Sequence, residues 1–300
     1  MIAVGNAMGR RASRIGNLFD GLAKWLLRFR IFSIPARALA NSKFAWSLIS
    51  RVDRIRVRRL KDRINNSTVP SHISIIMDGN RRFAWNKRLG SDFGHKLGKE
   101  KLKEVMDWIL DLGVKHLTVY ALSTENITGR TEDELETLFD LYVTGLNEIA
   151  EDPRIHSSKV RVRAAGRIDE LPDRVREAIA YAERQTAEYN EFTFTVCLGY
   201  GGREEIVDAV KSLAADHASG NISIDQINTE EISNRLYDAN IPDPDLVIRT
   251  SGEERVSNFL LWQIAYSELY FTDVHWPSFS KKDLFEAIES YQERRRRYGG

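Results

Sequence analysis

The sequence of 300 residues contains a single cysteine, Cys197. One cysteine cannot form a disulfide within the chain, and its scarcity is typical of proteins from a reducing compartment. Cys197 lies in an apolar, strand-like segment, so we interpret it as a buried core thiol. With 42% hydrophobic residues, the chain can bury a large core, organised as one large domain or two smaller ones.

The sequence also lacks a hydrophobic run long enough to span a membrane. The longest apolar stretches near the N-terminus, residues 31–36 and 44–50, are far shorter than the roughly 20 residues that a spanning helix needs. Arginines recur through the same region, which is not typical of a secretory signal. We therefore expect a cytoplasmic protein, either soluble or bound peripherally to the cytoplasmic face of a membrane.

The charge is distributed unevenly along the chain. Residues 1–70 hold 15 Lys and Arg against three Asp, a net charge of +12. Residues 71–300 hold 29 basic against 40 acidic residues, a net charge of −11. This asymmetry predicts a basic arm on a mildly acidic body. An anionic membrane and a nucleic acid both attract such an arm, and charge alone does not decide between them.

The arm contains one amphipathic pattern. Apolar residues recur at helical spacing from Leu18 to Phe29, and Lys24 and Arg28 lie on the other side. Such a helix either lies on a membrane surface or packs on the body or a partner subunit. Polar residues 65–68 and Pro70 predict a boundary. We therefore divide the chain into a basic helical extension, residues 1–69, and one globular domain, residues 70–300.

The globular region alternates strand-like and helical patterns, which predicts an α/β fold. A mostly parallel sheet of about six strands, covered by helices, accounts for the pattern. In such sheets ligands bind outside the carboxyl ends of the strands. The expected strands are 73–77, 116–122, 160–165, 192–198, 246–249 and 269–271, and the expected helices are 97–112, 132–150, 171–188, 204–215 and 284–297.

The first polar segment after a strand is Asp78-Gly79-Asn80-Arg81-Arg82. Glycine allows a tight turn, and the arginines can bind phosphate oxygens. An aspartate fits an anion site where a hard cation such as Mg²⁺ bridges it to the phosphates. Taken alone, Asp-Gly-Asn is equally well explained as a simple turn.

Three further segments follow strands. Ser123-Thr124-Glu125-Asn126 could orient a substrate or cap the helix near Glu132. Residues 245–258 bring Arg249, Arg255 and Ser257 to a glycine-containing loop, which predicts either a phosphate clamp or a surface ion-pair loop. Residues 199–203, Gly-Tyr-Gly-Gly-Arg, match no nucleotide-binding pattern, so we interpret them as a tight strand-to-helix turn.

Together these segments, with Phe93-Gly94-His95-Lys96 and the run from 245 to 271, resemble in order the signature regions of the cis-prenyltransferases, the family of undecaprenyl and dehydrodolichyl diphosphate synthases. The resemblance covers residues 70–300 and does not cover most of residues 1–60. It implies a Mg²⁺-dependent enzyme that condenses isopentenyl diphosphate with an allylic prenyl diphosphate to make a cis-polyprenyl diphosphate.

The resemblance also implies roles for individual residues. Asp78 would work with Mg²⁺ at the allylic diphosphate, Glu268 would complete a metal site, and Asn126 would take part in proton removal. The C-terminal Arg297-Tyr298-Gly299 resembles a tail that reaches a neighbouring subunit, which implies a homodimer. The implied substrate-binding residues are Gly79, Asn80, Arg81, Arg82, Phe83, Ser91, His95, Ser123, Glu125, Ile127, Arg130, Arg249, Arg255 and Ser257. Leu122, Phe139 and Leu198 are candidates for an apolar tunnel or, individually, for plain core packing.

Two positions depart from the family pattern. Ser91 replaces an arginine, for which Arg88 could substitute, and Ile127 replaces an aromatic residue. Arg130 stands one position later than the usual arginine. These changes leave open a short-chain or irregular, non-head-to-tail product.

Two rival interpretations belong to other classes of protein. A non-catalytic accessory subunit would have lost the metal and phosphate residues that this chain retains. A nucleic-acid-binding protein would need a recognisable module in the basic arm, and none is found there. We therefore expect no nucleic acid as a partner.

Overall fold

In the computed structural model the described residues are 57–64 and 67–298, with side chains described up to 295. The predicted amphipathic helix over 18–29, and the side chains of the Arg297-Tyr298-Gly299 motif, lie outside them. Within the described residues, no helix combines the length and hydropathy needed to cross a membrane.

Six parallel strands form one sheet in the order β3-β4-β2-β1-β5-β6. Their apolar, β-branched sequences suit a sheet that is buried on both faces, and all five residues of β1 are buried. The predicted α/β class and the positions of all six predicted strands are confirmed. The strands are β1 His72–Ile76, β2 His116–Ser123, β3 Val160–Ala165, β4 Phe192–Tyr200, β5 Leu246–Arg249 and β6 Glu268–Phe271.

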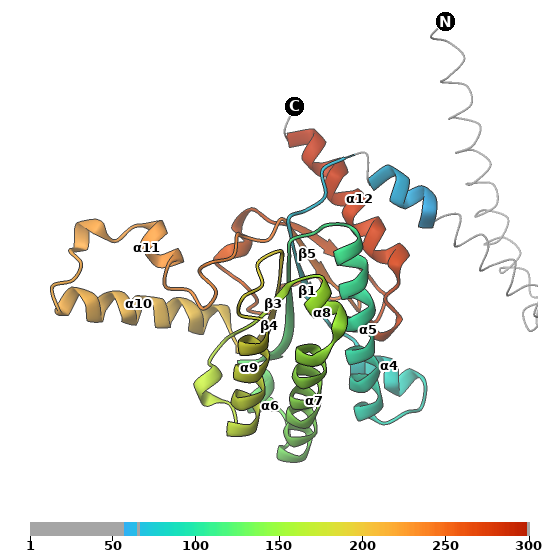
Figure 1. The fold of residues 1–300 in the computed structure, drawn as a ribbon, viewed down its shortest axis with the longest axis horizontal. Helices are drawn as coiled ribbons and strands as arrows, with labels where there is room; N and C mark the ends of the chain where they lie inside the picture. The colour runs from blue at the N-terminus through green and yellow to red at the C-terminus, as the bar shows by residue number, and fades with distance from the viewer. Residues whose placement is uncertain (1–56, 65–66, 299–300) are drawn as a thin grey trace, which may run out of the picture. The chain divides into compact units, whose positions relative to one another are not determined.

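The helices include all five predicted from the sequence (Figure 1). Short helices that the sequence analysis did not predict, such as α4, join several of the predicted elements. The α-helices from β1 onward are α4 Asn80–Asn86, α5 Ser91–Asp111, α6 Thr124–Gly129, α7 Glu132–Glu151, α8 Pro153–Ser157, α9 Asp173–Gln185, α10 Gly202–Ala218, α11 Thr229–Ser233 and α12 Lys281–Tyr298. Single 3₁₀ turns lie at Ile168–Glu170 (η2), Ile224–Gln226 (η3), Gln263–Tyr266 (η4) and Trp276–Ser278 (η5).

The chain builds the sheet outward from β1 in both directions: β2, β4 and β3 lie on one side of it, and β5 and β6 lie on the other. Ile76 pairs with Tyr120 of β2 and with Arg249 of β5. The carboxyl ends of these three strands therefore lie next to each other. In doubly wound sheets, this is where ligands bind.

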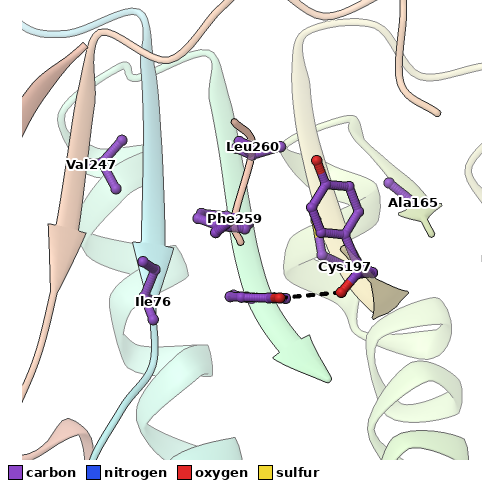
Figure 2. Close-up of a cluster of buried hydrophobic side chains, with 8 residues drawn as sticks. Ile76, Ala165, Cys197, Val247, Phe259 and Leu260 are labelled. Atoms are coloured by element: carbon purple, nitrogen blue, oxygen red, sulfur yellow. Dashed lines mark hydrogen bonds between the residues drawn. The ribbon is translucent and has the colours of Figure 1, made fainter. Parts of the chain in front are cut away.

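A cluster of buried side chains packs on one face of these central strands (Figure 2). Phe259 stacks on Tyr120 at a ring distance of 4.6 Å, and the hydroxyl of Tyr120 donates to the carbonyl of Tyr200 across 3.1 Å. Cys197 belongs to this cluster and is fully buried on β4, as predicted. The cluster joins the loop after β5 to the middle of the sheet, so that loop is held firmly.

Residues 57–64 form a further helix, and the compact body begins at Arg59. Leu60 and Ile64 are buried, with 3% and 0% of their surface exposed. Gln292 of α12 donates to the carbonyl oxygen of Ile64 across 3.1 Å, and Arg63 pairs with Glu289 at 2.6 Å. The last part of the predicted extension is therefore packed against α12.

Candidate functional site

A cavity of about 1090 Å³ opens at the carboxyl ends of β1, β2 and β5. Its walls come from the sheet, α4, α5 and α7, and Figure 1 shows α4 beside α5. Polar side chains line the end nearest the strand termini. The predicted site residues that line the cavity are Asp78, Gly79, Asn80, Arg81, Arg82, His95, Ser123, Glu125, Asn126, Arg130, Arg249, Arg255 and Ser257.

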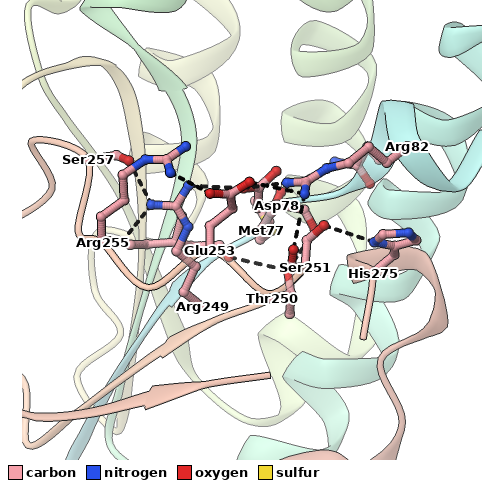
Figure 3. Close-up of polar contacts among 12 residues, drawn as sticks. Met77, Asp78, Arg82, Arg249, Thr250, Ser251, Glu253, Arg255, Ser257 and His275 are labelled. Carbon is pink, nitrogen blue, oxygen red and sulfur yellow. Dashed lines mark hydrogen bonds and ion pairs between the residues drawn. The ribbon is translucent and has the colours of Figure 1, made fainter. Parts of the chain in front are cut away.

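Asp78 lies between two arginines at the centre of this polar end (Figure 3). Its Oδ2 atom is 3.0 Å from Nη2 of Arg249 and 3.1 Å from Nη2 of Arg82. Burial raises the pKa of Asp78, but hydrogen bonds and charge from Arg249 and Arg82 outweigh it, so the pKa is below its ordinary value. The carboxylate is therefore ionised at neutral pH.

Arg249 is the best-buried cation of the cavity wall, with only 5% of its surface exposed. Its Nη1 atom donates to the carbonyl oxygen of Arg255 across 2.5 Å and to Oγ of Ser257 across 2.6 Å. The buried Nε atom has no partner among the described residues. The guanidinium group of Arg249 thus links the loop after β5 to Asp78, and its Nε–H remains available to donate to a ligand.

Glu253 joins the same cluster, although the sequence analysis did not select it. Its carboxylate is 3.2 Å from Nη1 of Arg82 and also pairs with Arg255 (Figure 3). Arg82 donates in addition to the carbonyl oxygen of Ser251 across 3.1 Å. The position of Glu253 between Arg249 and Arg255 was the signal available in the sequence.

Gly79 is required by the turn after β1. Its φ angle of 98° lies in the left-handed region, where other residues are strained. A Cβ atom there would also lie 2.7 Å from Oγ of Ser251 and 2.9 Å from Nδ1 of His275. The predicted tight turn at this position is therefore confirmed.

His95 reaches the cavity from α5 and carries no positive charge at neutral pH. Burial, with the nearby charges of Arg130 and Arg81, lowers its pKa to about 4. Its Nε2 atom is buried and has no hydrogen-bond partner among the described residues. His95 therefore offers a neutral imidazole with one unused ring nitrogen to whatever occupies the cavity.

The second predicted segment caps a helix, but not the one considered in the sequence analysis. Oγ of Ser123 accepts a hydrogen bond from the backbone N–H of Asn126 across 3.0 Å and caps α6. The helix α7, which begins at Glu132, is capped by Thr131 instead. The alternative that this segment caps α7 was therefore wrong, because a short separate helix intervenes.

Asn258, which we did not select as a site residue within the segment 245–258, connects that segment to the other two. Its Nδ2 atom donates to Glu125 and to Glu204, each across 2.9 Å. Its Oδ1 atom accepts from the backbone N–H of Arg203 across 2.9 Å. The predicted turn at 199–203 is confirmed, since β4 ends at Tyr200 and α10 begins at Gly202.

Away from the polar end, the cavity wall is largely apolar. Leu122 and Leu198 contribute to it, as predicted for a tunnel, whereas Phe139 does not line it. The main apolar contributions come from two elements that face each other across the cavity: Leu138, Leu141, Leu146 and Ile149 of α7, and Phe194, Val196 and Leu198 of β4.

Several predicted residues do not line the cavity. Phe83, Ser91 and Ile127 are absent from its walls, and so is the exposed Arg88, which we considered as a substitute for the missing arginine. Glu268 lies at the opposite end of the sheet, because it pairs with Leu246 at the start of β5. It forms an ion pair with Arg294 at 3.0 Å.

Comparison with known proteins identifies the family. Residues 76–299 match the family model described as putative undecaprenyl diphosphate synthase. The chain is 52% identical over 242 residues to tritrans,polycis-undecaprenyl-diphosphate synthase (geranylgeranyl-diphosphate specific) of Methanopyrus kandleri, covering 81% of this chain and 89% of that protein. It is 48% identical over 254 residues to the enzyme of the same name from Methanocaldococcus jannaschii, covering 83% and 90%.

A solved structure agrees with these matches. Lavandulyl diphosphate synthase from Lavandula x intermedia, determined in complex with dimethylallyl diphosphate, has a TM-score of 0.70 and 33% identity, covering 75% of this chain and 95% of that one. The chain therefore belongs to the undecaprenyl diphosphate synthase family of cis-prenyltransferases.

Proposed function

We propose that this transferase extends geranylgeranyl diphosphate with isopentenyl diphosphate, head to tail, and releases a long cis-polyprenyl diphosphate. The observation that carries the proposal is a cation-rich polar end, centred on Asp78, that opens onto a largely apolar cavity of about 1090 Å³. The primer is taken from the names of the relatives at 52% and 48% identity, which are geranylgeranyl-specific. A large apolar cavity favours a long product over the short or irregular alternatives.

The residues at the polar end fit a Mg²⁺ ion. Among the described residues, no three His, Cys, Asp or Glu side chains are grouped to enclose a metal. Mg²⁺ commonly binds one or two carboxylates and takes its remaining ligands from substrate phosphates and water. Asp78, ionised and with both arginines on Oδ2, supplies the carboxylate. When bound, the ion would neutralise charge that develops on the leaving diphosphate.

The allylic diphosphate is assigned to the loop after β1. Arg81 and Arg82 offer charge-assisted hydrogen bonds to its oxygens, and the glycine turn lets the backbone approach them. Asn80 and the neutral His95 complete that side of the cavity. Phe83 and Ser91 do not line the cavity, so we assign them to supporting α4 and the start of α5. Concentrated positive charge stabilises diphosphate as the carbon–oxygen bond breaks.

Isopentenyl diphosphate is assigned to the loop after β5. Arg249, Arg255 and Ser257 hold its diphosphate, and Ser123 at the end of β2, Glu125 of α6 and Arg130 after α6 complete this side of the cavity. The new carbon–carbon bond forms when the isopentenyl double bond attacks the allylic carbon. Asn126 orients the isopentenyl group during loss of its proton. An amide is not a useful base, so the proton passes to an oxygen of the departing diphosphate.

Further proposals concern a second subunit and the N-terminal extension. We retain the homodimer, and with it Glu268 as a metal ligand only at a site that a second chain completes, because within one chain it lies far from Asp78. We also retain residues 70–300 as the catalytic domain, against which residues 59–64 pack, and propose the part of the basic extension before them as a membrane-binding arm. Ile127 lies close to Gly199, where it supports the turn beside the cavity.

Product analysis tests the proposed function directly. Labelled isopentenyl diphosphate is incubated with Mg²⁺ and with allylic primers of ten, fifteen and twenty carbons, and the products are separated by length. We expect the twenty-carbon primer to give the highest rate and a long cis product. A branched product, or one extended by a single unit, would contradict the proposal, and so would the absence of incorporation with every primer.

A further inference from the structure

Three large apolar side chains are exposed where α4 meets α5: Trp85 at the end of α4, Leu89 in the connection, and Phe93 in the first turn of α5. Their exposed fractions are 80%, 42% and 47%. We call these three residues the apolar patch. Scattered exposed hydrophobics are common, but a group of three within so short a segment, including an indole, is typical of an interaction surface.

The backbone holds the apolar patch in place. The N–H of Leu89 donates to the carbonyl oxygen of Ala84 across 2.8 Å, and the N–H of Arg88 donates to that of Trp85 across 2.9 Å. Arg88 adopts a φ of 58°, which ends the helix in a tight left-handed turn. Ala84, on the other side of α4, is fully buried. The turn is therefore anchored inward and presents Trp85 outward.

The segment that carries the patch also carries three cations without ion-pair partners among the described residues. Lys87, Arg88 and Lys96 are exposed, and none of them has an ion-pair partner in the described part of the chain. Between positions 81 and 96, Asp92 is the one acidic residue. Each Lys or Arg near an anionic lipid surface strengthens binding about fivefold, and tryptophan favours the headgroup region. This combination matches the chemistry of an anionic bilayer.

The patch lies on the two elements that form one wall of the cavity. Asn80 and Arg82 of α4 and His95 of α5 line the cavity, and Figure 1 shows α4 beside the start of α5 at this end of the sheet. Docking there would bring the cavity next to the bilayer. We propose that the apolar patch inserts among the headgroups of an anionic membrane, which supplies the apolar primer and receives the product.

A second copy of this chain is a poorer occupant for the patch. In a two-fold contact the patch would meet its own copy, so Lys87, Arg88 and Lys96 would face identical cations. The proposal of membrane docking rests on the exposed side chains of the apolar patch. The proposal that the membrane supplies the primer and receives the product rests on the proposed function.

A site-specific probe tests the docking in the full-length protein. The only native thiol, Cys197, is fully buried, so Leu89→Cys can be labelled selectively with an environment-sensitive fluorophore. Ile224→Cys is the matched control, because Ile224 is 62% exposed on η3, outside the α4–α5 connection. Each labelled protein is mixed with vesicles of phosphatidylcholine, with or without phosphatidylglycerol, that carry brominated lipids as quenchers.

We expect the probe at position 89 to shift to the blue and to be quenched only with phosphatidylglycerol vesicles, whereas the probe at 224 stays in water. If the protein sediments with these vesicles while the probe at 89 stays in water, the basic arm binds alone and the docking is wrong. A concentration-dependent blue shift without vesicles would assign the patch to a second copy and would equally overturn the proposal.

A second variant separates docking from catalysis. Trp85→Ser should weaken vesicle binding about tenfold, which is the effect of removing one large apolar side chain from an interface. Its turnover of a short, water-soluble allylic diphosphate should equal that of the wild type. Unchanged vesicle binding would contradict the docking. Insertion of the probe without any prenyl transfer would contradict the proposed function alone.

Discussion

Arg249 donates through Nη2 to the carboxylate of Asp78 across 3.0 Å, although 171 positions separate them in the sequence. The contact exists because Arg249 ends β5 opposite Ile76, the last residue of β1. It makes the loop that we assign to isopentenyl diphosphate a structural support for the loop that we assign to the allylic diphosphate.

Asp78→Asn should remove the negative charge while keeping the shape of the side chain. Because we assign the carboxylate to Mg²⁺, turnover should fall more than about a hundredfold. Steady-state incorporation of labelled isopentenyl diphosphate measures this, with circular dichroism to check the fold. The matched control is Glu253→Gln, which removes the other carboxylate of the cluster and should reduce turnover far less. Near-normal turnover of Asp78→Asn with Mg²⁺ would refute the assignment.

Arg255→Ala tests the division between the two substrates. Loss of a charge-assisted contact should raise KM for isopentenyl diphosphate by about tenfold to a hundredfold and leave KM for the allylic primer nearly unchanged. Arg88→Ala, which removes an exposed arginine outside the cavity, should change neither value. If Arg255→Ala weakened only the allylic substrate, the two sites would have to be exchanged.

His95 should make the free energy of unfolding depend on pH. Folded His95 binds a proton only below pH about 4, whereas an unfolded histidine does so below about 6.5. Between these values the unfolded state binds more protons, so stability falls as pH falls, by up to about 3 kcal/mol. Urea titrations of His95→Gln should give a shallower slope over this range than the wild type.

His72 is buried on β1, and its pKa is also lowered to about 4, chiefly by burial. It adds a pH-dependent contribution of the same sign to both proteins, so only the difference between them reports on His95. Identical slopes would mean that His95 titrates normally in the fold.

Ile64→Ala tests whether residues 59–64 belong to the body. Because Ile64 is fully buried against α12, the substitution should lower the free energy of unfolding by about 2–4 kcal/mol. Arg59→Ala, on the exposed side of the same helix, should change it by less than about 0.5 kcal/mol. Equal stability of the two variants in denaturant titrations would show that this helix contributes little to the fold.

The sequence by itself determined the order of strands and helices, because apolar periodicity and strand-like runs are local features. It also predicted that Asp78 and Arg249 lie close together, since each follows or ends a strand and the carboxyl ends of parallel strands meet; their role at a phosphate site stays a prediction. The resemblance to known signature motifs then restricted the chemistry to prenyl transfer, and the family assignment is confirmed.

Only the tertiary structure decided which side chains meet. Glu253 pairs with Arg82, 171 positions earlier, and Asn258 holds Glu125 and Glu204 together, through contacts that no local pattern encodes. The register of β5 with β6 put Glu268 at the opposite end of the sheet from Asp78. Strand register and loop packing depend on contacts between residues far apart in the chain, so spacing along the sequence could not reveal them.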